Sequence, residues 1–403
     1  MLKKILKIIT ALILLTIISI VVFTCFFPVR IADGRILGYS KNEGEYLFLQ
    51  YQNIPVHHDG PYLLDNNNNK RSALYVNGDG ITPSKFLQKE IENSIEIFVD
   101  NNAETKFIVP LRKNYKRSKL IIPNPKKLLA ISDLEGEFDI MVKLLQANDV
   151  IDNSLNWSYG SGHLVLIGDM VDRGTNVVPL LWLIYKLEAE AKLAGGNVHF
   201  ILGNHERYLL DGRTKSANSK YYGTFRTIGM SQRELWSKKS ELGRWLRSKP
   251  VMLKIGNTLF LHAGVSPKIL NLHPTLQSID KEAEHNFAIG DVIRRTINDH
   301  VIHDADGIIF YRGLARNKGD DFSKKASDEH VKQILKEFKV DRIAIGHTIA
   351  EHVGYDYDGK VIRVDVHHSA KVSEGLFIEN DSLWRVNDKG NKSMLKQVSN
   401  LDQ

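Results

Sequence analysis

Five short polar segments recur along this chain, and each follows closely on an apolar run of the kind that forms a buried strand. The apolar runs cover residues 128–131, 164–167, 200–202, 258–261 and 343–345. The polar segments are Asp133-Leu134-Glu135-Gly136, Gly168-Asp169-Met170-Val171-Asp172-Arg173-Gly174, Gly203-Asn204-His205-Glu206, His262-Ala263-Gly264 and Gly346-His347-Thr348. Loops at the ends of neighbouring strands meet at one edge of a sheet. The pattern therefore predicts a single pocket lined by Asp, Glu, Asn and His.

The remaining pattern predicts a mixed α/β fold. With 403 residues and 43% apolar content, the chain can bury a full α/β core and a smaller appendage. From residue 128 onward, strand, polar loop and helix repeat, with helices expected over residues 137–146 and, as a long amphipathic helix, over 177–193. Late β-type runs at 360–365 and 376–379, near the turn residues Gly354 and Gly375, indicate hairpins. We expect a mixed sheet or two sheets packed face to face.

The first 29 residues form a separate segment. Residues 8–27 carry no charge and are mostly apolar, which is about the length that crosses a bilayer as a helix. Lys3, Lys4 and Lys7 precede this stretch and are expected to stay cytoplasmic. The sequence thus predicts a single-pass membrane anchor with everything after Pro28 outside the cytoplasm, in the periplasm or at the cell surface. If the segment is cleaved as a signal peptide, the chain is secreted.

Residues 30–127 read as a small β-rich extension. Turn signals stand at Asp59-Gly60 and in residues 77–80, and residues 60–64 and 73–76 are expected to pair as strands. A basic stretch over residues 112–127 precedes the first motif and is interpreted as a solvated linker, with contact to anionic lipid or steering of phosphorylated substrates as the alternative. No nucleic-acid motif accompanies the net charge of +7, so no nucleic-acid partner is expected. A single cysteine, Cys25, excludes an intramolecular disulfide and a cysteine-based zinc cluster.

The polar segments contain the ligand types that divalent metals need. Asp133 and Glu135 are two residues apart, so both carboxylates can leave a strand end on the same side, where they repel unless a cation lies between them. We expect one metal to be held by Asp133, Glu135 and Asp169. A second metal would share Asp169 and take an amide oxygen and two imidazoles, from Asn204, His262 and His347.

Two such metals, roughly 3.5–4 Å apart, would turn a bridging water into hydroxide and would clamp phosphoryl oxygens for in-line attack. The leaving oxygen needs a proton, and His205, next to the ligand Asn204, is the natural acid. Asp172 is expected to orient His205 and keep it protonated. Arg173 and Arg312 are expected to hold the substrate phosphate through charge-assisted hydrogen bonds.

Taken in order, these segments resemble those of the calcineurin-like metallophosphoesterases, in particular the phosphoprotein phosphatase branch and its bacterial Shewanella-like phosphatases. The resemblance spans about residues 128 to 388, and the Asp172-Arg173-Gly174 ending of the second segment is typical of that branch. It implies a four-layer αββα metallophosphoesterase sandwich over residues 128–403 and a dinuclear centre of Mn, Fe or Zn. It also implies hydrolysis of phosphomonoesters, on small molecules or on Ser, Thr or Tyr of phosphoproteins, with Arg173 as a phosphate ligand.

One residue departs from the family pattern. The family has Gly-Asp-x-His-Gly in its first motif, whereas this chain has Ser132-Asp133-Leu134-Glu135-Gly136. Glu135 can still bind a metal, but its added negative charge favours harder ions, Mn²⁺ or Mg²⁺, over Zn²⁺. We expect Mn²⁺ first, with Fe, Zn and Mg as alternatives.

Other functions use the same residue set. The metal pair would equally serve a dinucleoside polyphosphate hydrolase or a phosphodiesterase. A non-catalytic metal-binding module is a third interpretation, with Glu135 as the sign of a drifted site. Further side chains are expected to be structural: His367 and His368 rather than pocket-rim groups, and Tyr222, Trp236 and Trp245 as core residues rather than a substrate lid.

Overall fold

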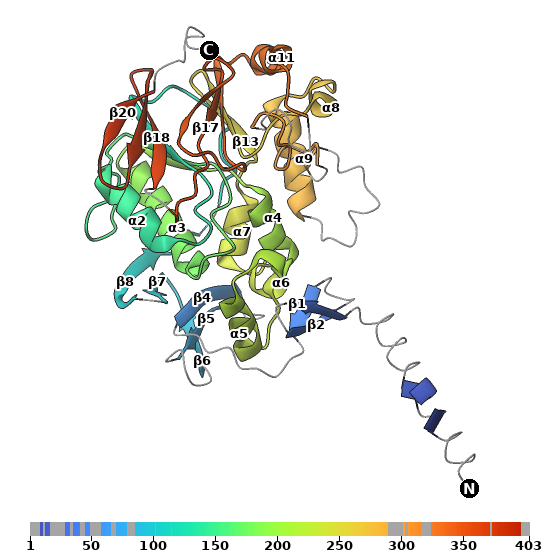
Figure 1. Cartoon of the computed structure of the whole chain (residues 1–403). Coiled ribbons are helices and arrows are strands. Elements are labelled where there is room, and N and C mark those ends of the chain that lie inside the picture. Colours follow the sequence, from blue (N-terminus) through green and yellow to red (C-terminus); the bar gives the residue numbers. More distant parts are fainter. Residues whose placement is uncertain are drawn as a thin grey trace.

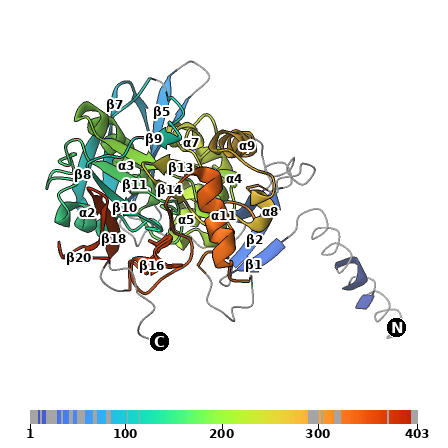
Figure 2. The same cartoon turned by 90° about the horizontal axis from the view of Figure 1, so that it is seen from above.

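A computed structural model describes most of the chain from residue 58 onward, together with short segments before it. The described residues are 9–10, 13–16, 29–32, 35–40, 45–48, 58–65, 70–78, 85–100, 102–113, 115–288, 301–302, 305–315, 324–370 and 373–395. Two six-stranded sheets form the centre of the molecule, with helices to either side (Figures 1 and 2). The predicted mixed α/β fold with facing sheets is therefore confirmed.

The first sheet combines parallel strands with a late antiparallel meander. In spatial order its strands are β12 (Asn197–Phe200), β11 (His163–Leu166), β10 (Lys127–Ile131), β18 (Glu374–Glu379), β19 (Ser382–Asn387) and β20 (Lys392–Met394). The three strands β10, β11 and β12 are parallel to one another, and β18 joins β10 in antiparallel register. The motif-bearing strands of this sheet thus all end at the same edge.

The second sheet carries the last two motifs. In spatial order its strands are β16 (Gly354–Asp356), β17 (Val361–Arg363), β15 (Arg342–Ile345), β14 (Thr258–Leu261), β13 (Met252–Ile255) and β9 (Ile121–Ile122). Strands β14 and β15 are parallel. β9 lies within the segment predicted as the extension, yet it pairs with β13 of this sheet.

Alternate residues of the central strands face two different cores. Leu128 and Ala130 of β10 share one buried cluster with Phe260 of β14 and Ala344 of β15, which fills the space between the sheets. Leu129 of β10 lies in the other, larger cluster together with the helices. Because both faces of these strands are buried, their sequences are continuously apolar rather than alternating.

The helices are α2 (Phe138–Ala147), α3 (Val177–Leu193), α4 (Asn204–Asp211), α5 (Ser219–Ile228), α6 (Gln232–Leu235), α7 (Glu241–Arg247), α8 (Pro267–Leu270), α9 (Leu276–Ala288) and α11 (Asp328–Phe338), with a 3₁₀ turn at Thr214–Ser216. The prediction for α3 is confirmed in its bounds and wrong in its character, because nearly every side chain of this helix is buried. One side of α3 contacts β12, and strands of the N-terminal region contact it as well. An amphipathic helix needs one solvent face, and the extension removes it.

The N-terminal region is β-rich, as predicted. β1 (Val29–Ala32), β2 (Arg35–Ser40) and β3 (Glu45–Phe48) form one antiparallel sheet, and β4 (His58–Asp65), β5 (Arg71–Asn77) and β6 (Lys85–Ile91) form another. β7 (Ser94–Val99) and β8 (Asn102–Pro110) make a hairpin. The predicted pairing of residues 60–64 with 73–76 is confirmed, since Leu63 lies opposite Ala73. In Figure 1 the β4–β6 and β7–β8 sheets lie beside the helical side of the first sheet.

Some local predictions were wrong. The turn expected at Asp59-Gly60 is an irregularity inside β4, where the pairing register shifts between Asp59 and Tyr62. Gly60 allows it, because its φ is 92° and a Cβ there would lie 2.5 Å from the Leu74 carbonyl. Gly375 lies within β18 rather than in a turn, and the strand expected at residues 200–202 is β12, which ends at Phe200.

The predicted membrane segment at residues 8–27 lies mainly outside the described residues. Within it, the structure describes only residues 9–10 and 13–16, which are helical. Ile9, Ile13, Leu14 and Leu15 have exposed side chains. Across the described parts of the chain, no helix combines the length and the apolar character needed to span a bilayer.

Candidate active site

The predicted pocket forms where the motif-bearing strands of both sheets end. A cavity of about 660 Å³ opens there. The predicted site residues that line it are Asp133, Glu135, Asp169, Arg173, Asn204, His205, Arg312 and His347. The two others, Asp172 and His262, lie directly behind this lining, where Asp172 contacts His205 and His262 contacts His347. All ten predicted residues are thus brought together from segments far apart in the chain.

The backbone of these loops is unusual. Six site residues have positive φ angles, namely Asp133 (53°), Glu135 (48°), Asp169 (54°), Asp172 (72°), Arg173 (52°) and His347 (66°). Non-glycine residues adopt this left-handed region rarely and at a cost, so the surrounding structure must hold it in place. The concentration of such residues around one cavity makes it the candidate functional site.

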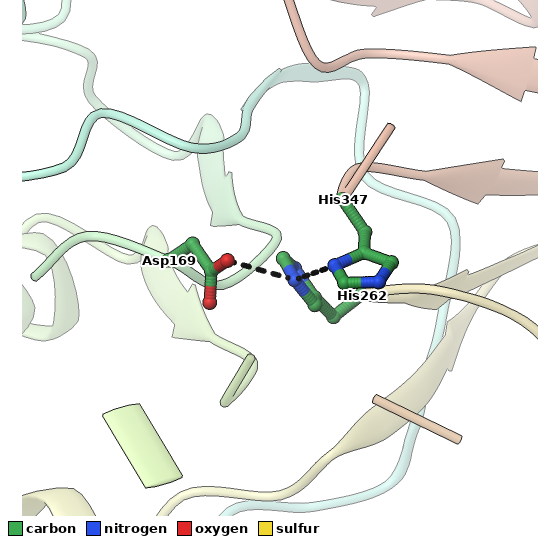
Figure 3. Close-up of side chains that lie close together, drawn as sticks. All are labelled: Asp169, His262 and His347. Carbon is green, nitrogen blue, oxygen red and sulfur yellow. Dashed lines mark hydrogen bonds and ion pairs between the residues drawn. The ribbon is translucent and has the colours of Figure 1, made fainter. Parts of the chain in front are cut away.

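Two histidines point one ring nitrogen each toward the same place. Nδ1 of His262 donates to the Ile167 carbonyl at 2.8 Å, and Nε2 of His347 donates to the Phe310 carbonyl at 3.2 Å. The opposite nitrogens, Nε2 of His262 and Nδ1 of His347, lie 3.2 Å apart. Figure 3 shows these two rings with Asp169 on the other side of His262. Carbonyl partners of this kind orient metal-binding imidazoles.

Two oxygen ligands complete this cluster. Oδ2 of Asp169 and Oδ1 of Asn204 each lie 3.1 Å from Nε2 of His262. Ligand atoms of Asp169, His262 and His347 all fall within 4.8 Å of one another. Lone pairs at such distances repel unless a positive charge lies between them. The donor set of one carboxylate, one amide oxygen and two imidazoles therefore fits a divalent transition metal.

The charges around His262 also favour a cation at this cluster. Burial lowers the pKa of His262, but the carboxylates of Asp169 and Asp133 outweigh burial and raise the pKa to about 10. Burial and the neighbouring His262 lower the pKa of His347 well below its ordinary value. The pocket thus requires positive charge at His262 Nε2, from a proton or a metal ion, while His347 stays neutral.

The first motif contributes two carboxylates in different surroundings. Oδ2 of Asp133 accepts a hydrogen bond from the His347 backbone N–H at 3.0 Å and another from the Ser132 hydroxyl. Burial raises the pKa of Asp133 to about 6. Glu135 groups instead with Asp169 and His205, within 4.8 Å, and forms an ion pair with Arg173. The residue that departs from the family pattern therefore faces the cavity between predicted metal and phosphate ligands.

His205 and Asp172 form a buried pair at the cavity wall. Nδ1 of His205 lies 2.8 Å from Oδ2 of Asp172, and its backbone N–H donates to Oδ1 of Asp169 at 2.8 Å. Burial lowers the pKa of His205, but Asp169 and Asp172 outweigh it and raise the pKa above its ordinary value. Nε2 of His205 faces the cavity side, 3.4 Å from Nη2 of Arg173. A protonated imidazole in this position can donate a proton to a group bound beside Arg173.

The two predicted phosphate-binding arginines both line the cavity. Arg173 is the more exposed, with 56% of its side chain accessible, and its guanidinium lies between Glu135 and His205. Nη1 of Arg312 donates to the His347 carbonyl at 2.7 Å and to the Thr348 hydroxyl at 3.0 Å. Arg312 thus also anchors the loop that carries His347.

Glu206 is a site residue for which the sequence predicted no role. Its carboxylate accepts hydrogen bonds from the backbone N–H groups of Gly203 (2.7 Å), Asp169 (2.9 Å) and Met170 (2.8 Å), and its side chain is fully buried. It joins the second motif loop to the start of α4. Its bond to the N–H of the N-cap residue Gly203 is one half of a capping box, but the Ser or Thr that marks this motif in a sequence is absent. Asp365, buried in the cavity lining, was also missed.

The structure also resolves the residues predicted to be structural. His368 is buried between the Ser132 carbonyl (2.7 Å) and the Ser373 hydroxyl (2.6 Å), and burial lowers its pKa to about 4, so it is a structural group. For His367 the prediction of a structural role is wrong, because its side chain is exposed and lines the cavity rim. Trp236 and Trp245 are buried, as is Tyr222, and their packing role is confirmed.

Comparison with known proteins agrees with this geometry. The family model for calcineurin-like phosphoesterases matches residues 126–351. The structure resembles a cold-active protein-tyrosine phosphatase of a psychrophilic Shewanella species, with 28% sequence identity, a TM-score of 0.76, and coverage of 84% of this chain and 100% of that one. A Shewanella-like protein phosphatase of Arabidopsis thaliana is 28% identical over 41% of this chain and 40% of its own length. A symmetrical bis(5'-nucleosyl)-tetraphosphatase of Neisseria gonorrhoeae is 28% identical over 34% of this chain and 44% of its own.

Proposed function

The chain belongs to the calcineurin-like phosphoesterase family, and on that premise we propose that its cavity hydrolyses phosphomonoesters with His205 as the general acid. The chain is a hydrolase that acts on phosphoric ester bonds. The observation that carries the proposal is the meeting, in one cavity, of a metal-binding donor set, the His205–Asp172 pair and the guanidinium of Arg173. Each of these parts is needed for phosphoryl transfer to water.

The family implies divalent metal ions, and the clustered oxygen and imidazole ligands around His262 fit one of them. Asp169, Asn204, His262 and His347 would hold one ion, and Asp133, Glu135 and Asp169 the other. When bound, such ions activate water and neutralise charge on the phosphoryl oxygens. We propose Mn²⁺ as the preferred ion, because Glu135 supplies a hard carboxylate oxygen where the family has an imidazole.

His205 would give its proton to the leaving oxygen of the ester. Asp172 holds Nδ1 of His205 at 2.8 Å and so fixes the ring orientation with Nε2 toward the cavity. The carboxylate of Asp172 beside Nδ1 favours the charged imidazole, as an acid requires. Asp172 would therefore act through His205 rather than on the substrate.

Arg173 and Arg312 would bind the non-bridging oxygens of the phosphate. Arg173 lies 3.4 Å from His205 Nε2, so a phosphate held by its guanidinium places the ester oxygen near the acid. Two parallel N–H donors match two phosphate oxygens, which makes arginine better suited than lysine here. Glu135 pairs with Arg173 when no substrate is bound, so a phosphate would have to displace Glu135 from the guanidinium.

The substrate class is proposed as phosphomonoesters, including those of Tyr, Ser or Thr in proteins. The resemblance to the Shewanella protein-tyrosine phosphatase supports this, since it extends over 84% of this chain. A second candidate, hydrolysis of a dinucleoside polyphosphate or another phosphodiester, is supported by the likeness to the Neisseria tetraphosphatase over 34% of the chain. A non-catalytic metal-binding role is disfavoured, because the acid pair and Arg173 are intact.

One experiment separates these functions. The purified chain is stripped of metal, reloaded separately with Mn²⁺, Mg²⁺, Zn²⁺ or Fe²⁺, and supplied with an aryl phosphomonoester or the matching aryl phosphodiester. We expect metal-dependent hydrolysis of the monoester, fastest with Mn²⁺ and strongly reduced in His205→Ala. Preference for the diester, or for a dinucleoside polyphosphate, would favour the second candidate. Bound metal without turnover on any of these substrates would contradict both.

We also propose that residues 8–27 anchor the chain in a membrane, with residues 30–127 and the catalytic residues 128–403 outside the cytoplasm. The support is the uncharged, mostly apolar stretch behind Lys3, Lys4 and Lys7. Full-length chain should sediment with membranes and be digested by protease added from the outer side. A shorter product in the medium would indicate cleavage and secretion, and intact chain in the cytosolic fraction would contradict the proposal.

A further inference from the structure

The loop that carries Asp172 and Arg173 is held from behind by main-chain contacts. Asp172 and Arg173 both have left-handed φ angles, which are unfavourable for these residues without outside support. The N–H of Arg173 donates to the Ser216 carbonyl at 3.0 Å, and its own carbonyl accepts from Asn218 Nδ2 at 2.8 Å. The position of the Arg173 guanidinium in the cavity therefore depends on what holds residues 172–177.

Lys220, on α5, holds Thr175 of the same loop. Its Nζ donates to the Thr175 carbonyl at 2.6 Å, and the hydroxyl of Tyr221 donates to the same carbonyl at 2.9 Å. The Tyr221 oxygen in turn accepts from the Val177 N–H at 3.0 Å. Lys220 is only 6% exposed, so its charge needs a buried partner.

The partners come from the N-terminal β-rich extension. Nζ of Lys220 lies 3.2 Å from Oδ2 of Asp100, at the end of β7, and 3.7 Å from Oδ1 of Asp59, in β4. Asp59 is 3% exposed, and its other oxygen accepts from the hydroxyls of Tyr62 (2.8 Å) and Thr224 (2.7 Å). Among the described residues, no hydrogen-bond donor reaches Asp59 Oδ1. Its compensation is therefore the ammonium of Lys220.

The extension also contacts the loop directly. The backbone N–H of Asp100 donates to Oδ1 of Asn176 at 3.0 Å, and Oδ1 of Asp100 accepts from the His58 N–H at 2.7 Å. Two strands of the extension thus converge on the rear of the loop whose front carries Arg173. Asp59 and Asp100 place largely buried carboxylates between the extension and the catalytic residues, which an extension without a role at the site would not require.

We propose that Asp59 and Asp100 of the extension, acting through Lys220, are positioning residues that set the geometry of Arg173 for phosphate binding. The extension then contributes to phosphate binding at the active site, although Asp59 and Asp100 do not line the cavity. This inference rests on the proposed phosphate-binding role of Arg173. Residues that hold metal ligands in place commonly change metal affinity or activity about 10- to 100-fold, and we expect an effect of similar size on phosphate binding here.

The test compares two buried lysines in the Mn²⁺-loaded full-length chain. Lys220→Met removes the contacts of Lys220 with Thr175, Asp59 and Asp100, which we call the brace. Lys249→Met is the matched control. Lys249 is 3% exposed and lies 2.8 Å from the carboxylate of Glu188, away from the cavity. Calorimetry with inorganic phosphate is the readout, with thermal unfolding measured in parallel. We expect Lys220→Met to weaken phosphate binding at least about tenfold, and Lys249→Met to leave binding within twofold even where it lowers stability.

A second comparison separates positioning from general destabilisation. In the Arg173→Ala background, Lys220→Met should cause no further loss of phosphate affinity, because both changes remove the same contact. Lys220→Arg, which keeps the charge, should restore part of the affinity. If Lys220→Met does not fold, Asp100→Asn supplies the same test, since it removes the charge and keeps an oxygen for the His58 N–H.

Equal losses in Lys220→Met and Lys249→Met would overturn the inference, as would additive losses with Arg173→Ala. Phosphate affinity is measured by calorimetry rather than by turnover. The experiment can therefore contradict the positioning role of Lys220 without contradicting phosphomonoester hydrolysis, and the reverse. A wild-type chain that binds phosphate but hydrolyses no phosphomonoester contradicts the proposed function and leaves the brace testable. A wild-type enzyme that turns over normally, with unchanged phosphate affinity in Lys220→Met, contradicts the brace alone.

Discussion

Glu135 and Arg173 face each other in the cavity and form an ion pair between Oε1 and Nη1. The carboxylate stands where the family pattern has a histidine, so a proposed metal ligand is paired with a proposed phosphate ligand. Glu135 adds negative charge beside Asp169, and it holds Arg173 before a substrate binds. This contact links the glutamate that departs from the family pattern to the arginine proposed to bind phosphate.

If Glu135 is a metal ligand, its removal should change metal content. Glu135→Ala is expected to lower the bound metal from two ions per chain toward one, because Asp133 and Asp169 alone supply too few ligands. Activity should fall at least about tenfold. Metal content of the purified variant, measured by elemental analysis, is the primary readout.

Glu135→His is the informative companion variant, since it restores the family's residue. It should keep two ions and shift the preference from Mn²⁺ toward Zn²⁺, because imidazole is a softer ligand than carboxylate. If Glu135→Ala instead retains two ions and full activity, Glu135 is a partner of Arg173 only.

Arg173 is expected to dominate phosphate affinity. A hydrogen bond to a charged group contributes about 1.5–3 kcal/mol, so Arg173→Ala should raise the inhibition constant for inorganic phosphate roughly 10- to 100-fold. Arg173→Lys should recover only part of this, because it keeps the charge and loses the paired donors. Competitive inhibition of monoester hydrolysis measures both. An inhibition constant that is unchanged in Arg173→Ala would remove Arg173 from the phosphate site.

Glu206 should matter for the order of the motif loops rather than for the chemical step. Glu206→Gln replaces one accepting oxygen by an amide group that faces backbone N–H donors, which leaves a buried hydrogen bond unmade. We expect the free energy of unfolding to drop by about 1–3 kcal/mol, with weaker metal binding. Denaturant unfolding and metal titration would check this. A variant as stable as wild type would show that the three N–H groups have other partners.

The sequence predicted the site better than it predicted the packing. Motif residues such as His262 and His347 could be assigned because their chemistry is carried by residue type and by the strand before them. α3 shows which part of the packing the sequence did not predict. Its bounds followed from the local pattern, but its burial depends on strands more than 60 residues away in the chain.

Long-range partners explain the remaining misses. From the sequence, Lys220 would be expected at the surface. Only the fold brings Asp59 and Asp100 beside it. The left-handed backbone at Asp133 and Asp169 has only a weak signal in residue type, because aspartate adopts this region more often than most residues but far less often than glycine. Glu206 was missed because its N-cap residue is Gly203, which lacks the side chain that marks a capping box in a sequence.

A buried charge cluster away from the cavity should control acid stability. Glu188 accepts from Lys249 Nζ (2.8 Å), Arg112 Nη1 (2.9 Å) and Trp245 Nε1 (2.7 Å). Burial opposes its charge, but Lys249 and Arg112 outweigh burial and hold the pKa of Glu188 well below its ordinary value. A carboxyl whose pKa is lower in the folded state stabilises the fold above its unfolded pKa, about 4.3, and loses this contribution as pH falls through the folded value.

Glu188→Gln should therefore lower the free energy of unfolding at pH 7 by about 3–5 kcal/mol, the usual effect of breaking a buried ion pair. The difference from wild type should shrink as pH falls below about 4. Glu90→Gln, which breaks the exposed Lys70 pair, is the control and should stay within about 0.5 kcal/mol. A wild-type-to-Glu188→Gln difference that stays constant from pH 7 to pH 3 would contradict this role.

The most direct test of the account is the leaving-group dependence of hydrolysis in the Mn²⁺-loaded wild type and in His205→Asn. A series of aryl phosphomonoesters is used, with phenols of increasing pKa as leaving groups. Because His205 is proposed to protonate the leaving oxygen, the variant should lose roughly 100-fold or more on poor leaving groups and far less on good ones. The variant's rates would then fall more steeply with leaving-group pKa than those of wild type. An equal loss across the whole series would contradict the assignment of His205 as the acid.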